Sequence, residues 1–145
     1  MADEITYYSH DLDDGLDHKL INEQQLNEVT LWQKCSKLVE KKYPGLKGKR
    51  RRAYIIRTLI DRQVADLISA TSEYIQNFKF ESSDEIRRHH ERLIRHSKEA
   101  QKDNQQLKQF LYENLYHHEA VAMPNAKGGN VIADVFSFYE QNPKM

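Results

Sequence analysis

The chain has 145 residues, of which 39% are hydrophobic and 30% are charged, and its 22 basic and 22 acidic side chains cancel. This length fits one domain, and so charged a composition, with only 5 Gly and 3 Pro, favours amphipathic helices over a sheet. The balanced charge points to no particular partner, and a single cysteine excludes an intrachain disulfide and a CxxC zinc pattern.

Hydrophobic periodicity predicts helices in the first half of the chain. Residues 3–16 are predicted to form the first helix. Asn22 is a suitable N-cap for a second helix, with Gln25 at the capping-box position, and Pro44 ends that helix. Residues 53–78 carry apolar side chains at spacings of three and four, which predicts a long helix that forms the spine of a bundle.

The second half of the chain continues the helical pattern with more interruptions. Serines near position 82 predict the start of a short helix through Ile94, and Ser97 predicts the start of another that reaches residue 116. Pro124 and the pair of glycines after it predict a break before a last helix over 131–139. Nothing in the sequence alternates like a strand, so the predicted fold class is all-α, a multi-helix bundle.

Location is predicted from what the sequence lacks. The acidic start has no apolar run of the kind found in secretory signals. No stretch approaches the roughly 20 apolar residues that a membrane helix needs. We therefore expect a cytoplasmic protein without a membrane partner.

A row of polar side chains near the N-terminus is the first candidate site. Asp3, Tyr7 and Asp11 are four residues apart, so they share one stripe of a helix, and Asp14 continues it. Carboxylates around a tyrosine suit a cation, or sugar and phosphate groups, and carboxylates are natural ligands of Mg²⁺ or Mn²⁺. The commoner reading is that acidic residues near a helix N-terminus face water and favour the helix dipole.

A basic segment precedes the long helix and is the second candidate site. Guanidinium groups and free backbone N–H groups at a helix start favour phosphate, whereas a solvated charge run is the alternative. Tyr54 is the only aromatic residue among these charges, so a platform for single-stranded nucleic acid is weakly indicated. The possible phosphate-binding residues are Lys47, Lys49, Arg50 and Arg51, and Arg52 extends the run.

Three motifs resemble one enzyme family, in the same order along nearly the whole chain. ADEITYYSHDLDDGL resembles the segment ADEIAYxxHDxDDGL of the dGTPase-like HD-domain dNTP triphosphohydrolases. KRRRAYIIRTLIDRQVADLISAT and LKQFLYENLYHHEAV are similar to two later segments of that family. The resemblance implies the C-terminal part of such an enzyme, as one helical domain. In it, residues 1–20 form the last active-site helix of the HD core and 21–145 a phosphohydrolase-associated region.

The resemblance also implies residue roles. Asp3 corresponds to the last ligand of the HD metal centre, Tyr7 to a residue near the triphosphate and Asp11 to a residue on the 3′-hydroxyl side of the deoxyribose. Tyr54 corresponds to a tyrosine that packs on the deoxyribose, and Arg57 to a basic residue that contacts phosphate. The third motif implies no catalytic role, and its aromatic residues are expected to pack in the core.

Histidines are expected to bind no metal here. His10-Asp11 spells "HD", but the resemblance implies that the metal-binding His-Asp pair and a further His belong to a part N-terminal to this chain. His89-His90 and His117-His118 are adjacent pairs that point about 100° apart on a helix, so both members cannot face one metal. Solvated surface is the expected place of these two pairs.

Two function classes follow. The first is part of a metal-dependent enzyme that hydrolyses a dNTP, dGTP foremost, to deoxynucleoside and tripolyphosphate, with Mg²⁺ or Mn²⁺ as cofactor. This chain alone is then expected to be inactive, because one carboxylate cannot hold a catalytic metal in a defined geometry. The alternative is a stand-alone helical module that binds nucleotide or oligomerises without catalysis. A homo-oligomer is expected in either class.

Overall fold

The computed structural model describes residues 1–143, and over that range it contains helices and no strand. The predicted all-α class is therefore confirmed. The elements in chain order are α1 (Ala2–Asp17), α2 (Glu23–Leu26), α3 (Thr30–Lys42), α4 (Gly48–Gln76), α5 (Ser83–Arg88), α6 (Lys98–Leu111), the π-helical turn η1 (Tyr112–Tyr116) and α7 (Glu119–Gln141).

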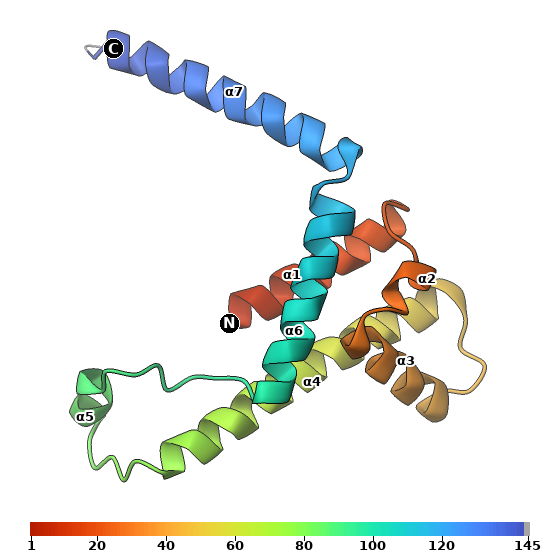
Figure 1. The fold of residues 1–145 in the computed structure, drawn as a ribbon, viewed down its shortest axis with the longest axis vertical. Coiled ribbons are helices and arrows are strands. Elements are labelled where there is room, and N and C mark those ends of the chain that lie inside the picture. The colour runs from red at the N-terminus through yellow and green to blue at the C-terminus, as the bar shows by residue number, and fades with distance from the viewer. Residues whose placement is uncertain (144–145) are drawn as a thin grey trace.

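Four helices enclose the hydrophobic core. α1 and α3 both pack against α4, and α6 packs against α1 and α3; Figure 1 shows α6 crossing in front of α1. Each of these helices contributes side chains that are almost fully buried, such as Leu12, Trp32, Leu59 and Leu107. The end of α4 with α5, and α7 beyond Val121, which packs against the core, project away from it (Figure 1).

The prediction of one continuous second helix is wrong, because the helix is interrupted between α2 and α3. The capping box at its start is confirmed: Asn22 Oδ1 accepts from the Gln25 N–H at 3.0 Å, and Gln25 Oε1 accepts from the Asn22 N–H at 2.9 Å. The break is held by Gln106 of α6, whose amide accepts from the Thr30 N–H at 3.0 Å and donates to the Glu28 carbonyl at 2.9 Å. These two bonds satisfy backbone groups that a continuous helix would pair internally.

α4 is the longest helix, yet it acts as a spine over its first half only. Ile55, Ile56 and Leu59 are buried, whereas Val64 and Ile68 farther along are 40% and 61% exposed. The apolar periodicity therefore predicted the helix correctly but overestimated its buried face. α5 also ends earlier than predicted, at Arg88.

The break predicted at Pro124 and the two glycines after it is wrong, because α7 is continuous from Glu119 to Gln141. A proline inside a helix removes one backbone hydrogen bond, and each glycine costs about 1 kcal/mol relative to alanine. These penalties weaken a helix without forbidding it. Gly128 and Gly129 lie in open space with ordinary helical backbone.

Two glycines in different helices are expected to respond oppositely to alanine. Gly128→Ala should stabilise α7 by about 1 kcal/mol, because the new methyl group meets no atom. Gly15 lies in α1, where a Cβ would stand 3.0 Å from the Ile21 side chain and 3.2 Å from Leu115. Overpacking there costs about 1–3 kcal/mol, so Gly15→Ala should lower the free energy of unfolding despite its better helix propensity.

Urea unfolding measures the Gly15 variant, and amide hydrogen exchange within α7 measures the Gly128 variant, because α7 lies outside the core. A gain of global stability from Gly15→Ala would contradict the close approach of α1 to Ile21 and Leu115.

Candidate functional site

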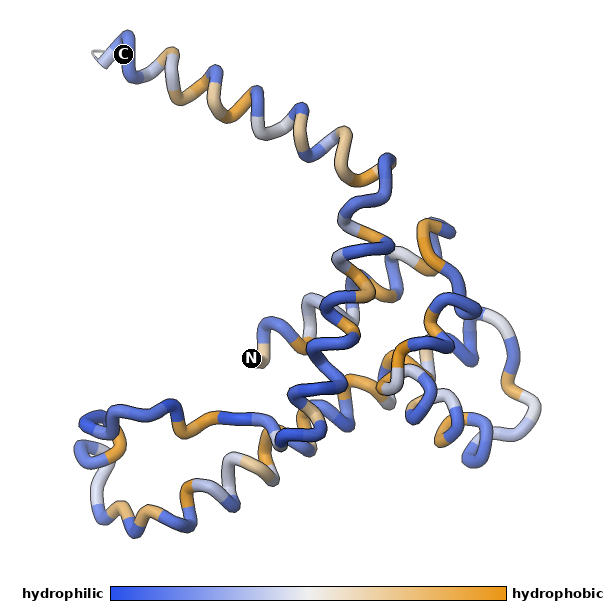
Figure 2. The backbone as a smooth tube through the Cα atoms, viewed as in Figure 1, coloured by the Kyte–Doolittle hydropathy of each residue, from blue (hydrophilic) through white to orange (hydrophobic). Residues whose placement is uncertain are grey.

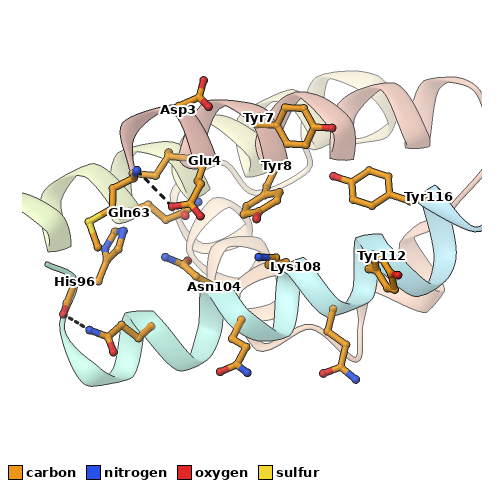
Figure 3. Close-up of a pocket in the computed structure, with 15 residues that line it drawn as sticks. Asp3, Glu4, Tyr7, Tyr8, Gln63, His96, Asn104, Lys108, Tyr112 and Tyr116 are labelled. Carbon is orange, nitrogen blue, oxygen red and sulfur yellow. Dashed lines mark hydrogen bonds and ion pairs between the residues drawn. The ribbon is translucent and has the colours of Figure 1, made fainter. Parts of the chain in front are cut away.

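A groove of about 790 Å³ runs between α1 and α6, with α4 behind it, as Figure 3 shows. This volume lies within the range of small-molecule sites. α1 contributes one wall and α6 with η1 the other. The groove is lined by Met1, Asp3, Glu4, Ile5, Tyr7, Tyr8, Gln63, His96, Gln101, Asn104, Gln105, Lys108, Gln109, Tyr112 and Tyr116.

Two residues of the predicted acidic stripe, Asp3 and Tyr7, line this groove. Asp3 and Tyr7 are exposed residues of its α1 wall. Asp11 is half-buried one turn farther on, and its carboxylate accepts a hydrogen bond from the hydroxyl of Tyr116. The rings of Tyr7 and Tyr116 lie 6.4 Å apart. The structure therefore brings the three predicted residues to one side of α1 and adds a tyrosine from η1.

Tyr116 was predicted as a core side chain, and it packs half-buried against the core while its hydroxyl bonds to Asp11 of α1. Burial and the hydrogen bond to the Asp11 carboxylate raise the pKa of Tyr116 well above its usual range. Its hydroxyl therefore remains a neutral donor at physiological pH. This bond fixes the direction in which the Asp11 carboxylate points, because that oxygen is held by a donor on another element.

Tyr116→Phe removes this hydrogen bond between η1 and α1 and is expected to lower the free energy of unfolding by about 1–2 kcal/mol. Tyr112→Phe is the matched control, because Tyr112 lies on the same turn and is 56% exposed. Urea unfolding at neutral pH measures both. Equal stabilities of the two variants would contradict the proposed bond.

His10 and Asp11 face different partners, as expected for adjacent residues on a helix. His10 Nε2 lies 3.5 Å from an oxygen of Asp14, whereas Asp11 bonds to Tyr116. Among residues 1–143, no group of three or more His, Cys, Asp or Glu side chains could hold a metal ion. Asp3 would therefore need ligands from elsewhere, and the described residues do not fit a complete HD metal centre.

The other histidines have varied surroundings. His90, His117 and His118 are exposed as predicted, and His118 caps α7 by accepting from the Ala120 N–H at 3.3 Å. The expectation of solvated surface is wrong for His89, because its ring packs 4.6 Å from that of Phe78.

The basic segment makes ion pairs within the chain. Lys49 and Arg52 both bind Asp17 at the end of α1, and the Lys49 hydrogen bond, followed by the charges of Lys49 and Arg52, holds the pKa of Asp17 below its usual range. Arg51 binds Glu23 and the hydroxyl of Ser36. These contacts tie the start of α4 to α1, α2 and α3. Lys47 is the N-cap of α4, and Lys47 and Arg50 are exposed.

Tyr54 and Arg57 do not line the groove between α1 and α6. They line a second cavity of about 650 Å³ between α3 and α4. There the Tyr54 ring packs 4.8 Å from that of Tyr43, and the Arg57 guanidinium lies 6.0 Å from the Tyr54 ring. Within the described residues, Tyr54 and Arg57 therefore lie in a different cavity from Asp3 and Tyr7.

Sequence reasoning missed the groove residues outside the acidic stripe, chiefly Tyr8, Gln63, Asn104 and Tyr116. One signal for Gln63 was present. It follows Ile56 and Leu59 at spacings of three and four, and a glutamine at such a position lies on the buried face of a helix. The long-range contact of Tyr116 with Asp11 spans 105 residues and has no local signal.

Comparisons with known proteins agree with the sequence motifs. Residues 94–145 match the family model of the phosphohydrolase-associated domain. Proteins named deoxyguanosinetriphosphate triphosphohydrolase-like protein match the whole chain. The one from Geobacter sulfurreducens is 34% identical over 144 residues, which cover 99% of this chain and 37% of that protein. The one from Ralstonia nicotianae is 34% identical over 145 residues, which cover 100% of this chain and 37% of that protein.

The chain spans little more than a third of the length of these relatives. None of its helices within residues 1–143 is long and apolar enough to cross a membrane. The match to the associated domain begins at residue 94, so the predicted division after residue 20 stays a prediction. The chain is thus a relative of the deoxyguanosinetriphosphate triphosphohydrolase-like proteins and corresponds to a C-terminal segment of them.

Proposed function

We propose that the groove between α1 and α6 is part of the substrate site of a dNTP triphosphohydrolase, with dGTP as the first substrate to test. The products would be a deoxynucleoside and tripolyphosphate. The observation that carries this proposal is the placement of Asp3 and Tyr7 on one wall of the groove, with Asp11 on the same side of α1 and bonded to the groove residue Tyr116. The names of the relatives support a nucleotide as the substrate class.

The proposed roles follow from position. Asp3 is one ligand of a divalent cation, Mg²⁺ or Mn²⁺, whose remaining ligands come from outside the described residues. Tyr7 contacts the triphosphate, and Asp11 accepts a hydrogen bond from the 3′-hydroxyl while Tyr116 holds its other side. Asp3, Glu4 and Asp11 would repel a bare triphosphate, so nucleotide binding should require the divalent cation.

The proposal includes further contacts to phosphate or sugar, made by Tyr54, Arg57 and the basic segment. Tyr54 and Arg57 line the cavity between α3 and α4, so they would contact another part of the substrate or another nucleotide. Lys47 and Arg50 are the exposed candidates for phosphate. Lys49 and Arg51 would have to exchange their carboxylate partners.

The experiment measures both binding and turnover by the 145-residue chain. Titration calorimetry with each dNTP and Mg²⁺ or Mn²⁺ should show cation-dependent binding, which Asp3→Ala weakens. Asp13→Ala is the control, because Asp13 is an exposed acidic residue of α1 outside the groove lining. No release of tripolyphosphate is expected, because the described residues lack a complete metal site.

Two results would change the proposal. Absence of any nucleotide binding would overturn it. Metal-dependent tripolyphosphate release that Asp3→Ala abolishes would show that a metal site is completed within or between these chains, and the expected inactivity would be wrong.

The second candidate function is a helical module that oligomerises, and α7 favours it. Its apolar side chains are exposed, including Ile132 at 72% and Phe136 at 70%, and the orange segments of the projecting helix in Figure 2 mark where hydrophobic residues recur along it. Sedimentation of the chain should then show a homo-oligomer that Phe136→Asp dissociates.

Binding to nucleic acid through residues 47–52 is the weaker proposal, and a steep loss of affinity with salt would support it. A cytoplasmic location stays a prediction.

A further inference from the structure

Gln63 is a polar residue placed where the core continues. It lies on α4 next to the buried Ile56 and Leu59, and its side chain is only 3% exposed. Its amide reaches the groove between α1 and α6, where Figure 3 shows it behind Glu4. A buried amide in such a position normally has a hydrogen-bond partner.

Two buried polar atoms at this end of the groove lack a partner within residues 1–143. They are Nε2 of Gln63, a donor, and Oδ1 of Asn104 on α6, an acceptor. Both residues line the groove. An unpaired buried donor or acceptor costs more free energy than a hydrogen bond returns. A ligand that offers both an acceptor and a donor would remove both penalties together.

The walls beside these amides are aromatic. Tyr8 is half-buried in the groove, and its ring packs edge-on against that of Tyr7 at 5.9 Å. Tyr112 lines the opposite wall farther along the groove, eight residues after Asn104. Aromatic walls with a few placed polar groups suit a flat heterocycle, which stacks on the rings and presents its edge to the amides.

We propose that Gln63 and Asn104 read the edge of the nucleobase and thereby set base preference. This inference rests on the proposed function. Gln63 Nε2 donates to a base carbonyl or ring nitrogen, and Asn104 Oδ1 accepts from a base N–H. Tyr8 stacks on the base. His96, buried beside them with its Nδ1 held 2.9 Å from Asp66, closes the end of the groove.

A base satisfies this pair of amides better than the other parts of a nucleotide. A phosphate offers acceptors at neutral pH and leaves Asn104 Oδ1 unpaired. A sugar hydroxyl has no flat face for Tyr8. Every nucleobase has a π-face, and each presents donors and acceptors on its edges.

The second cavity that borders both amides does not offer the same fit. Gln63 and Asn104 also line a space of about 90 Å³ toward Asp66 and Ser97. At roughly 30 Å³ for each water molecule, that space holds a few waters. The wider groove is the side on which a heterocycle fits.

The position also agrees with the proposed sugar and metal contacts. The deoxyribose of a nucleotide carries three substituents: the 3′-hydroxyl, the 5′-phosphate and the base. Asp11 and Asp3 would hold the first two, and they lie about 12 Å apart along α1 at 1.5 Å per residue. The base then enters the groove beneath α1, where the amides of Gln63 and Asn104 lie.

The test is titration calorimetry of the full chain with each of the four dNTPs and Mg²⁺, with tripolyphosphate as the ligand that has no base. The unsubstituted chain should prefer one base by about tenfold or more, as expected for one buried hydrogen bond. Gln63→Met should lose this preference and leave tripolyphosphate affinity unchanged. Gln63→Glu, which replaces the donor by an acceptor, should change the preferred base.

Controls separate base reading from folding. Gln76→Met makes the same change on the same helix at an exposed position outside the groove, and it should retain the base preference. Circular dichroism should show the helix content of Gln63→Met and Gln63→Glu unchanged. An unfolded Gln63→Met would leave the decision to the isosteric Gln63→Glu.

Each result decides one proposal. Equal affinities of the unsubstituted chain for all four bases, or the same preference in both Gln63 variants, would overturn base reading while dNTP binding upheld the proposed function. If neither dNTPs nor tripolyphosphate bind, the proposed function fails. Free deoxynucleosides then decide the inference: binding that Gln63→Met weakens tenfold supports it, and absence of binding overturns it.

Discussion

Replacing Trp32 by alanine is expected to lower the free energy of unfolding by about 3–5 kcal/mol. Trp32 is 1% exposed in α3, among the largest buried side chains of the core. The loss combines the transfer of apolar surface to water with a cavity that surrounding helices fill only in part. Domains are stable by about 5–15 kcal/mol in total, so this one change should remove a large share of the stability.

Urea unfolding followed by far-UV circular dichroism measures the effect, because the substitution removes the only tryptophan of the chain and with it the fluorescence signal. Leu38→Ala is the control, since Leu38 lies on the same helix and is 43% exposed. It should cost less than about 1 kcal/mol. Similar losses in the two variants would contradict the placement of Trp32 in the core.

Local signals in the sequence predicted local structure well. The capping box at Asn22 and Gln25 is confirmed because its atoms are three residues apart and depend on no other element. Ser97 as the N-cap of α6 is confirmed for the same reason. The break before α3 was missed because it depends on Gln106, which lies 76 residues from the N–H group that it accepts from.

Apolar periodicity predicts that a helix has a face but not whether another element covers it. This limit explains α4, whose second half exposes Val64 and Ile68. It also explains Gln63, which residue type alone assigns to the surface although its position on the helix is buried. Gln63, which we propose reads the base, was therefore missed because glutamine is usually a surface residue.

The acidic stripe could be predicted from spacing because one helix carries all three residues. The partner of Asp11 could not be predicted, since Tyr116 reaches it from η1, 105 residues along the chain. The separation of Tyr54 and Arg57 from this groove depends on how α3, α4 and α1 pack. A sequence motif alone does not show which neighbouring helices its residues will face once the chain has folded.

Asp66→Ala is expected to cost about 2–3 kcal/mol, because it removes the acceptor that anchors the start of α6 to α4. One oxygen of Asp66 accepts from the Ser97 N–H at 3.1 Å and lies 2.9 Å from His96 Nδ1. A carboxylate only accepts, so the histidine nitrogen donates. Without Asp66 the ring of His96, which is 7% exposed, loses this partner.

The same carboxylate gives this contact a defined pH dependence. Burial alone would raise the pKa of Asp66, but hydrogen bonds from Ser97 and His96 outweigh it and hold that pKa below the ordinary value of 3.8. A lowered folded-state pKa stabilises the fold above the unfolded-state value, and this contribution is lost as pH falls through the folded-state value. Asp66→Asn, which keeps an acceptor without a charge, isolates the effect.

At neutral pH the unsubstituted chain should therefore be more stable to urea than Asp66→Asn. The difference should shrink only below about pH 4, where the unfolded chain begins to take up the proton first. A difference that stays constant to low pH would mean that the charge of Asp66 does not stabilise the fold. Because His96 also closes the groove, Asp66→Ala should weaken base preference together with stability, whereas Trp32→Ala should reduce binding only in proportion to the unfolded fraction.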